Sequence, residues 1–197
     1  MSVSGQLRRI TSDQGGVLRV SEAEAAGINR RSVMHYVYRE GLVRLGKGVY
    51  APEDAWIDDM WLLSLRSDKV VFSHESALLL HSLIDREPEA LTVTVPSGYN
   101  ARFLRADGVR VYFIKPELLL LGQTHVATPD GNTVSAYDME RTICDLVRSR
   151  SRIDHQTFIS ALKTYARQSN KRLDVLQKYA MQLGVEKLLQ SYLEVLL

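Results

Sequence analysis

Polar side chains able to contact nucleic acid gather on one side of a helix predicted over residues 30–40. At about 100° per residue, five of them share one arc of the helical wheel: Arg31, Ser32, His35, Tyr38 and Arg39. Arginine presents a fork of N–H donors that fits guanine edges and phosphates, and serine, histidine and tyrosine supply further donors. The spacing therefore predicts a helix face that enters the major groove of DNA, as the second helix of a helix-turn-helix does.

The opposite arc of the same helix is apolar. It carries Val33, Met34, Tyr36 and Val37, which we expect to pack against the preceding helices. A charged arc opposite an apolar one is typical of any surface helix, so this pattern alone does not establish DNA binding. The order of the surrounding elements and a local excess of positive charge favour it.

Further donors flank this helix. Asn29 can cap this helix. Asn29 and Arg30 stand at its start, where free backbone amides and the helix dipole favour a phosphate. Lys47 lies at the tip of a tight Gly46–Gly48 hairpin, within reach of a neighbouring phosphate or the minor groove. Additional contacts to the DNA backbone are expected from Arg19 and Arg44.

Two more helices are predicted before the polar one. Periodic apolar residues indicate the first over 3–14. Ser21 and Glu24 have the spacing of a capping box, so a second helix is expected to begin at Ser21. It ends at Gly27, where a helix-turn-helix needs a residue free to adopt positive φ.

A β-hairpin is predicted after the polar helix. Gly41 stops that helix, and the segments 42–45 and 49–51 flank a glycine-rich turn. Together with a short extended segment at 17–20, this gives the element order of a winged helix. The sequence therefore predicts an α+β chain: an N-terminal winged helix-turn-helix, then a mixed α/β C-terminal domain that ends in a helical segment.

The rest of the chain mixes both element types, separated by turn residues. Helices are predicted over 56–65, 73–84, 139–149, 154–169, 171–183 and 185–197, and strands over 91–95 and 109–114. The charge changes sign within 51–58, so the boundary is expected there, with domains at 1–54 and 55–197.

The charge is unevenly distributed in an otherwise ordinary globular composition of 45% hydrophobic and 24% charged residues. The net charge of +2 divides into +4 over residues 1–50, −7 over 51–140 and +5 over 141–197. This argues for a localised positive surface at the N-terminus rather than a uniform coat. The basic side chains of the last third form either a solvated face or a second surface for nucleic acid or a partner.

The expected location is the cytoplasm. The single cysteine, Cys144, excludes an internal disulfide and a Cys-rich zinc module. The sequence shows neither a signal-peptide pattern nor an apolar run long enough to cross a bilayer. We therefore expect no contact with a membrane.

The histidines and the cysteine give weak catalytic patterns. His74 and His81 are seven residues apart and can share a helix face, but no third metal ligand has a suitable spacing. Packing in the core or at a helix cap is the favoured interpretation of both. Cys144 has apolar neighbours, which favours a packed thiol over a nucleophile.

The acidic residues give an equally weak catalytic pattern. Asp130, Asp138 and Glu140 are the candidate acids of a metal-dependent nuclease or nucleotidyltransferase, but the expected downstream Glu-x-Lys strand is missing. Asp138, Glu140 and Asp145 are interpreted instead as a helix cap and solvent-exposed pairs, with Arg141 one turn from Asp145. We expect no catalytic residue, no metal and no cofactor.

Four segments, taken in order, resemble a known family over nearly the whole chain. They are Gly16-Val17 through Gly48-Val49-Tyr50 with Ala51-Pro52, Phe72 to Leu83, Thr92 to Pro96, and Ser135 to Leu146. The family is that of the AbiEi-type antitoxins, from bacterial abortive-infection, type IV toxin–antitoxin systems. None of the segments is a catalytic signature.

The resemblance implies two activities in phage defence. The winged domain would bind inverted repeats in double-stranded DNA upstream of its own operon and repress transcription. The C-terminal domain would counteract a neighbouring nucleotidyltransferase toxin without forming a stable complex with it. The chain would be a monomer or weak dimer when free, with two copies on the operator.

Other classes of function remain as alternatives. The winged unit can instead be a protein-interaction module that docks on a toxin or a polymerase subunit, or part of a generic transcriptional regulator. An enzyme acting through the acidic residues is the third class.

Overall fold

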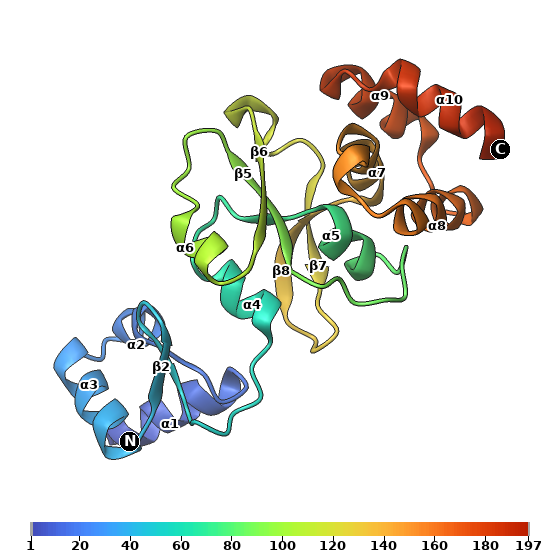
Figure 1. The fold of residues 1–197 in the computed structure, drawn as a ribbon. Helices are drawn as coiled ribbons and strands as arrows, with labels where there is room; N and C mark the ends of the chain where they lie inside the picture. The colour runs from blue at the N-terminus through green and yellow to red at the C-terminus, as the bar shows by residue number, and fades with distance from the viewer. Residues whose placement is uncertain (1, 197) are drawn as a thin grey trace. The chain divides into compact units, whose positions relative to one another are not determined.

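The computed structural model describes residues 2–196 in two compact units, which divide between Arg66 and Ser67 (Figure 1). The first unit extends beyond the boundary expected after residue 54. It does so because helix α4 (Asp59–Ser64) packs Trp61 against the same apolar cluster as strand residues Val49 and Ala51. The division therefore falls after α4, and the charge change at 51–58 does not mark it.

The first unit has the predicted winged-helix arrangement. Its elements before α4 are α1 (Val3–Asp13), β1 (Leu18–Arg19), α2 (Val20–Ala25), α3 (Arg30–Arg39), β2 (Val43–Gly46) and β3 (Val49–Ala51). The strands form an antiparallel sheet in the order β1-β3-β2, so the β2–β3 hairpin is the wing. Gly27, between α2 and α3, has φ +82°, as the turn requires.

A small core fixes the orientation of α3. Leu7 of α1, Ala23 of α2 and Val33 of α3 are fully buried in one cluster, and Tyr36 and Val37 join it. Because these three residues of α3 face inward, the polar arc predicted from the sequence faces outward.

The start of α2 differs from the prediction. Helix α2 begins at Val20, with Arg19 as its N-cap, so Ser21 lies inside the helix and no capping box forms. The reason is strand pairing: Arg19 pairs with Val49 in the sheet, and the Val20 amide donates to the Gly48 carbonyl at 2.8 Å. The helix thus continues directly from the strand.

The predicted cap of α3 is confirmed, and its contribution can be measured. Asn29 Oδ1 accepts from the Ser32 amide at 2.9 Å. Asn29→Ala should lower the free energy of unfolding of the first unit by about 1 kcal/mol, because that amide loses its acceptor. Ser21→Ala is the control and should change it by less than about 0.5 kcal/mol. Equal losses in denaturant titrations of the two variants would contradict this assignment.

The second unit is a mixed sheet with helices, as the α+β prediction requires. Its helices are α5 (His74–Leu80), α6 (Arg102–Ala106), α7 (Met139–Arg148), α8 (His155–Arg167), α9 (Leu173–Leu183) and α10 (Glu186–Leu196), with short 3₁₀ turns at Pro116–Leu118 and Arg150–Arg152. Its strands are β4 (Val71–Phe72), β5 (Thr92–Pro96), β6 (Arg110–Ile114), β7 (Gln123–Ala127) and β8 (Thr133–Tyr137). The strand order is β6-β5-β4-β8-β7.

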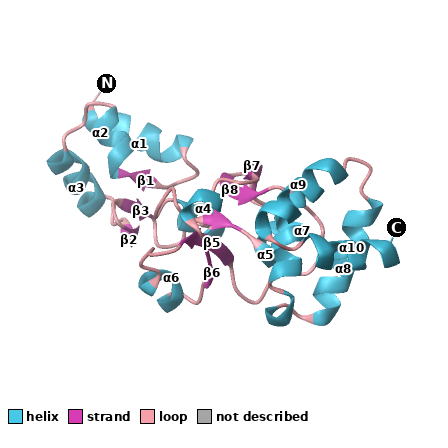
Figure 2. Cartoon of the chain, turned by 90° about the horizontal axis from the view of Figure 1, so that it is seen from above, coloured by secondary structure: helices cyan, strands magenta, loops and turns pink. Residues whose placement is uncertain are grey.

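Four helices of the second unit, α5, α8, α9 and α10, lie around α7, whereas α6 lies beside β6 (Figure 2). Helix α7 contacts α5, α8, α9 and α10, and buries Ile143, Leu146 and Val147 among them. The predicted C-terminal helical segment is therefore confirmed. None of the helices within residues 2–196 has the length and apolar character of a membrane-spanning helix.

Candidate nucleic-acid interface

Helix α3 presents the face that the sequence predicted. Arg31 and His35 are exposed one turn apart, and Tyr38 is 89% exposed. Ser32 is half-buried, and its amide is held by Asn29. Met34 departs from the prediction: it is 36% exposed rather than buried, because three inward residues already fill the contact with α1 and α2.

The side chains best placed to contact DNA are unengaged in the protein. Within residues 2–196, no hydrogen bond or ion pair holds Arg31, His35 or Lys47. Lys47 is exposed at the turn of the wing, between β2 and β3. Since no internal partner must be broken, these side chains can donate to base edges or phosphates without loss inside the protein.

A shallow hollow of about 230 Å³ joins the wing to the start of α3. Lys47, Arg30 and Glu24 line it, and Arg30 makes an exposed pair with Glu24 at 3.6 Å. Exposed pairs of this kind contribute little and are screened by salt. The hollow thus places two cations where a phosphate could lie beside the N-terminal end of α3.

Three arginines of the predicted interface are engaged within the first unit. Arg39 donates to Glu40 and to Ser4 Oγ at 3.1 Å, and Arg44 donates to the Gly46 carbonyl at 3.0 Å. Arg19 donates to Gln14, pairs with Glu22 and lies over the Trp61 ring. Arg19 therefore tethers α4 and the loop after α1, a role that the sequence did not indicate.

The acidic residues at the start of α7 and within it are engaged inside the protein. Asp138 caps the helix at the Arg141 amide, as predicted. Glu140 and Asp145, expected to be solvent-exposed, are buried, which corrects the prediction. Glu140 accepts from Arg172, and Asp145 accepts from the fully buried Arg141 at 3.0 Å.

Pairing with arginines explains why Glu140 and Asp145 are buried. Arg172, one of the basic residues of the last third of the chain, binds both Asp138 and Glu140 from the start of α9. Burial raises the pKa of Asp145, and the guanidinium of Arg141 opposes the rise. Among residues 2–196, no three histidine, cysteine or acidic side chains are grouped to hold a metal ion.

His74 lies in α5 and His81 directly follows it, and both pack in the core or at the helix cap, as the sequence predicted. His81 Nε2 lies 2.7 Å from the Tyr137 carbonyl oxygen. His74 is buried and stacks on Tyr112, with ring centroids 3.4 Å apart. Burial, and then nearby arginines, lower the pKa of His74 well below its ordinary value, so the ring is neutral at neutral pH.

Cys144 should be unreactive in the folded protein. The thiol is buried, its Sγ lies 3.7 Å from the Leu176 carbonyl oxygen, and burial raises its pKa to about 12. Because the thiolate is the nucleophile, iodoacetamide at pH 8 should leave the native chain unmodified and alkylate it once in denaturant. Mass spectrometry distinguishes the two; rapid alkylation of the native chain would contradict a packed thiol.

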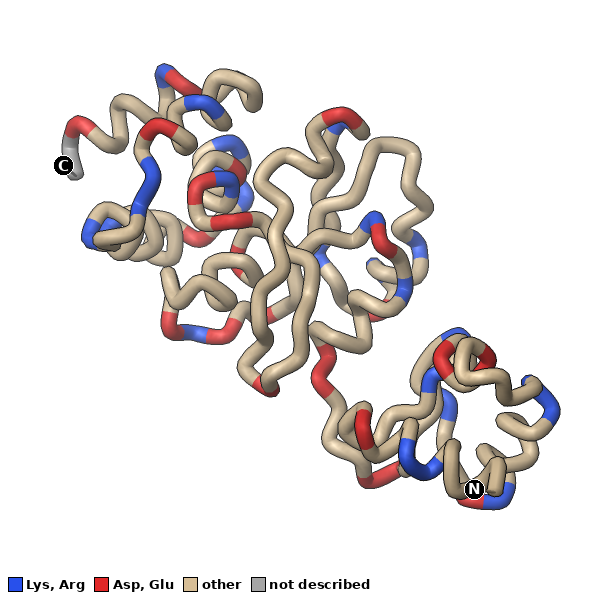
Figure 3. The backbone as a smooth tube through the Cα atoms, turned by 180° about the vertical axis from the view of Figure 1, so that it is seen from behind, with Lys and Arg blue, Asp and Glu red and all other residues tan. Residues whose placement is uncertain are grey.

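Charges of both signs are interspersed along both units (Figure 3). The unengaged set on α3 and the wing, Arg31, His35 and Lys47, is therefore distinguished by its position and its lack of partners, and not by charge density. We call this set the α3–wing face.

Comparisons with known proteins agree with this arrangement. Residues 5–52 match a family model described as "Transcriptional regulator, AbiEi antitoxin". This confirms the resemblance to AbiEi-type antitoxins, and the matched residues span α1 to β3. No curated protein matches the sequence.

Among solved structures, the crystal structure of the RV2827C protein from Mycobacterium tuberculosis resembles the chain with a TM-score of 0.58. The sequences are 19% identical, and the match covers 91% of this chain and 69% of that one. At this identity the likeness shows the fold, and it extends over both units.

Proposed function

We propose that the chain is the antitoxin of a type IV toxin–antitoxin system that represses its own operon by binding inverted repeats with the α3–wing face. The observation that carries this proposal is the set of unengaged donors Arg31, His35 and Lys47, in a domain that matches the AbiEi regulator model. Two copies of the chain bind one operator, and the site of action is the cytoplasm, where bacterial DNA lies.

The two parts of this face have different tasks. Arg31 and His35 on α3 contact base edges in the major groove, with the exposed Met34 and Tyr38 beside them. Lys47 on the wing contacts a phosphate and carries no sequence information. The half-buried Ser32, the cap Asn29 and the pair-forming Arg30 orient the start of α3.

The second unit supplies the other activity. In this proposal it counteracts a nucleotidyltransferase toxin encoded next to the gene, without a stable complex. The matched model is described as an antitoxin, but it covers residues 5–52 of the first unit, so assigning this activity to the second unit is part of the proposal. The chain itself performs no catalytic step, and the buried pairing of Glu140 and Asp145 supports that assignment.

Gel-shift titration of the full chain on its upstream DNA tests the repressor activity. The logarithm of the affinity should fall linearly with the logarithm of salt concentration, because each phosphate contact releases counterions. Unrelated DNA of the same length should bind more weakly. Equal affinity for both DNAs would contradict sequence-specific repression.

Co-expression with the adjacent gene tests the antitoxin activity. The full-length Arg31→Ala/His35→Ala/Lys47→Ala variant should still neutralise a nucleotidyltransferase toxin while it loses repression. If the two activities are always lost together, one surface serves both. A stoichiometric complex with the toxin and no DNA shift would favour the protein-docking alternative.

A further inference from the structure

The segment Ser73 to Ser76 has chemistry that DNA binding does not use. It lies at the start of α5 in the second unit, and all four residues are buried although all are polar. Thr92 and Thr94 of β5 satisfy Ser73 and Ser76 through hydrogen bonds of 2.5–2.8 Å. The histidine and the glutamate between them require separate explanation.

His74 is held in a strained backbone conformation. Its φ is +48°, a region that residues with a side chain rarely occupy. Ser73 Oγ and Ser149 Oγ each lie 3.0 Å from one of its ring nitrogens, and Tyr112 stacks on the ring. Because these contacts fix the strained residue, they also fix the position of the next side chain, Glu75.

Glu75 has one satisfied and one unsatisfied carboxylate oxygen. The residue is 7% exposed, and its Oε1 accepts from Arg110 at 2.8 Å. Its Oε2 is buried and has no hydrogen-bond partner among the described residues. A buried carboxylate oxygen without a donor is unfavourable, so this oxygen requires a donor from the adjoining cleft, either solvent or a bound group.

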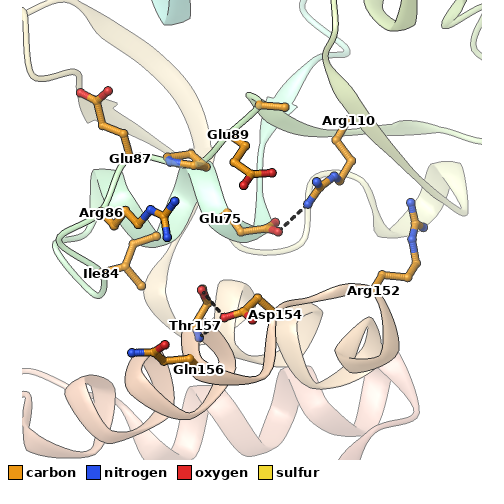
Figure 4. A pocket seen from close by; sticks show the side chains of 12 residues that line it. Glu75, Ile84, Arg86, Glu87, Glu89, Arg110, Arg152, Asp154, Gln156 and Thr157 are labelled. Atoms are coloured by element: carbon orange, nitrogen blue, oxygen red, sulfur yellow. Dashed lines mark hydrogen bonds and ion pairs between the residues drawn. The ribbon is translucent and has the colours of Figure 1, made fainter.

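A cleft of about 370 Å³ lies beside Glu75 in the second unit (Figure 4). It is lined by α5 and the loop after it, by Arg110 of β6, and by residues from 152–157. Figure 4 shows the Glu75 carboxylate in the middle, with the side chains of Arg86 and Glu89 directed towards it and that of Glu87 directed away. A volume of this size suits a small polar group or a single long side chain.

Most of the other charges in the cleft are already committed. Arg110 binds Glu75, and Arg152 lies over the Tyr112 ring at 4.2 Å. Asp154 caps α8 by accepting from the Thr157 amide and hydroxyl. The lining holds four carboxylates against three arginines, an excess of one negative charge. The charge of Glu75 is paired with Arg110, but its Oε2 still lacks a donor among the described residues. Within that same part of the chain, Glu89 and Arg86 are the unpaired charges directed to the middle, and Arg86 is exposed and free to turn to solvent.

We propose that this cleft binds a cationic N–H donor, a guanidinium or an ammonium group, with Glu75 Oε2 as its buried acceptor. Glu89 is the second carboxylate, at the exposed side of the cleft. The bound cation displaces Arg86 outward. The donor belongs either to a small amine or to an arginine or lysine side chain of a partner protein, and both present the same chemistry to Glu75.

Isothermal titration of the full chain tests this site with three probes. Agmatine is the small cation, and a capped pentapeptide with one central arginine represents a partner's side chain. The same peptide with citrulline, a neutral isostere, is the control. At least one cationic probe should bind saturably, and the citrulline peptide should not. Binding of agmatine assigns a small amine, whereas binding of the arginine peptide alone assigns a protein side chain.

Three variants give the charge dependence of this binding. Glu75→Gln and Glu89→Gln should weaken it, the former by about tenfold or more because its carboxylate is desolvated. Arg86→Gln should strengthen it, since a competing cation is removed. Glu89 and Arg86 are exposed, so replacing them should not disturb folding. The Glu89→Gln and Arg86→Gln variants therefore test cation binding even if Glu75→Gln does not fold.

Three results would overturn the proposal. They are the absence of saturable binding by both cations, equal binding of the citrulline peptide, and a reversed order of the Glu89 and Arg86 variants. The cleft lies wholly within the second unit, so the outcome is independent of DNA binding.

Discussion

Arg141→Met should lower the free energy of unfolding of the second unit by about 3–5 kcal/mol, because it leaves the buried Asp145 carboxylate without its cation. Arg141 is fully buried, its Nε donates to Asp145 at 3.0 Å, and one terminal nitrogen donates to the carbonyls of Leu118 and Leu121. A loss of this size is a large part of the stability of a typical domain, about 5–15 kcal/mol. Denaturant titration measures it.

The loss should depend on pH. Burial raises the pKa of Asp145 and Arg141 opposes the rise, so removing Arg141 raises this pKa further. A carboxyl whose pKa is higher in the folded chain contributes stability below its unfolded pKa and loses it as pH rises through the folded value. The deficit of the variant should therefore be larger at pH 8 than at pH 5.

Arg148→Ala is the matched control for this effect. Arg148 is the other arginine beside Asp145, but it lies 3.8 Å away and its side chain is 35% exposed. Its removal should lower the free energy of unfolding by less than about 1 kcal/mol, as for a solvent-screened pair. Similar losses for the two variants would contradict the central position of Arg141.

Arg31→Ala/His35→Ala should remove most of the preference of the chain for its operator over unrelated DNA. A bidentate base contact, which the Arg31 guanidinium can make, discriminates against a wrong base by about 1–3 kcal/mol, and His35 can add a single hydrogen bond. Losing both should reduce the specificity ratio by about tenfold or more. Lys47→Ala should instead weaken binding to all sequences alike and reduce the salt dependence by about one counterion. Competition titrations with operator and unrelated DNA separate the two effects.

The behaviour of Arg44→Ala checks the geometry behind this prediction. Arg44 is also an exposed arginine of the winged unit, but its Nε already donates to the Gly46 carbonyl. Its replacement should change specificity less than the loss of Arg31 and His35. If Arg44→Ala relaxed specificity more, the bases would be contacted from the wing instead of α3.

The first unit was largely predictable because its signals are local. The polar arc of α3 follows from helical periodicity, and the Asn29 cap and the Gly27 turn follow from single residues. The prediction that α2 begins at Ser21 was wrong because β1 pairs with β3, some thirty positions away in the sequence. This pairing overrode the local capping pattern. Tertiary contact also kept Met34 out of the core.

The second unit was less predictable because distant contacts decide it. Strands β7 and β8 were missed: β7 lies at the edge of the sheet, and its residues are exposed or half-buried rather than regularly alternating. Glu140 was predicted to lie at the surface because the sequence does not indicate its partner. That partner is Arg172, from the start of α9. The orphan oxygen of Glu75 depends on Arg110 and on the strained His74, and no sequence pattern indicates either.

The most direct test of the central claim is a gel-shift titration of Arg31→Ala/His35→Ala/Lys47→Ala on the upstream operator DNA. Its control is Lys163→Ala/Lys178→Ala, which removes the same formal charge from exposed positions of the second unit. We predict that the triple variant loses on the order of a hundredfold in affinity, while the control stays within a few-fold of the unmodified chain. Unchanged affinity of the triple variant would contradict the assignment of the α3–wing face as the DNA-binding surface.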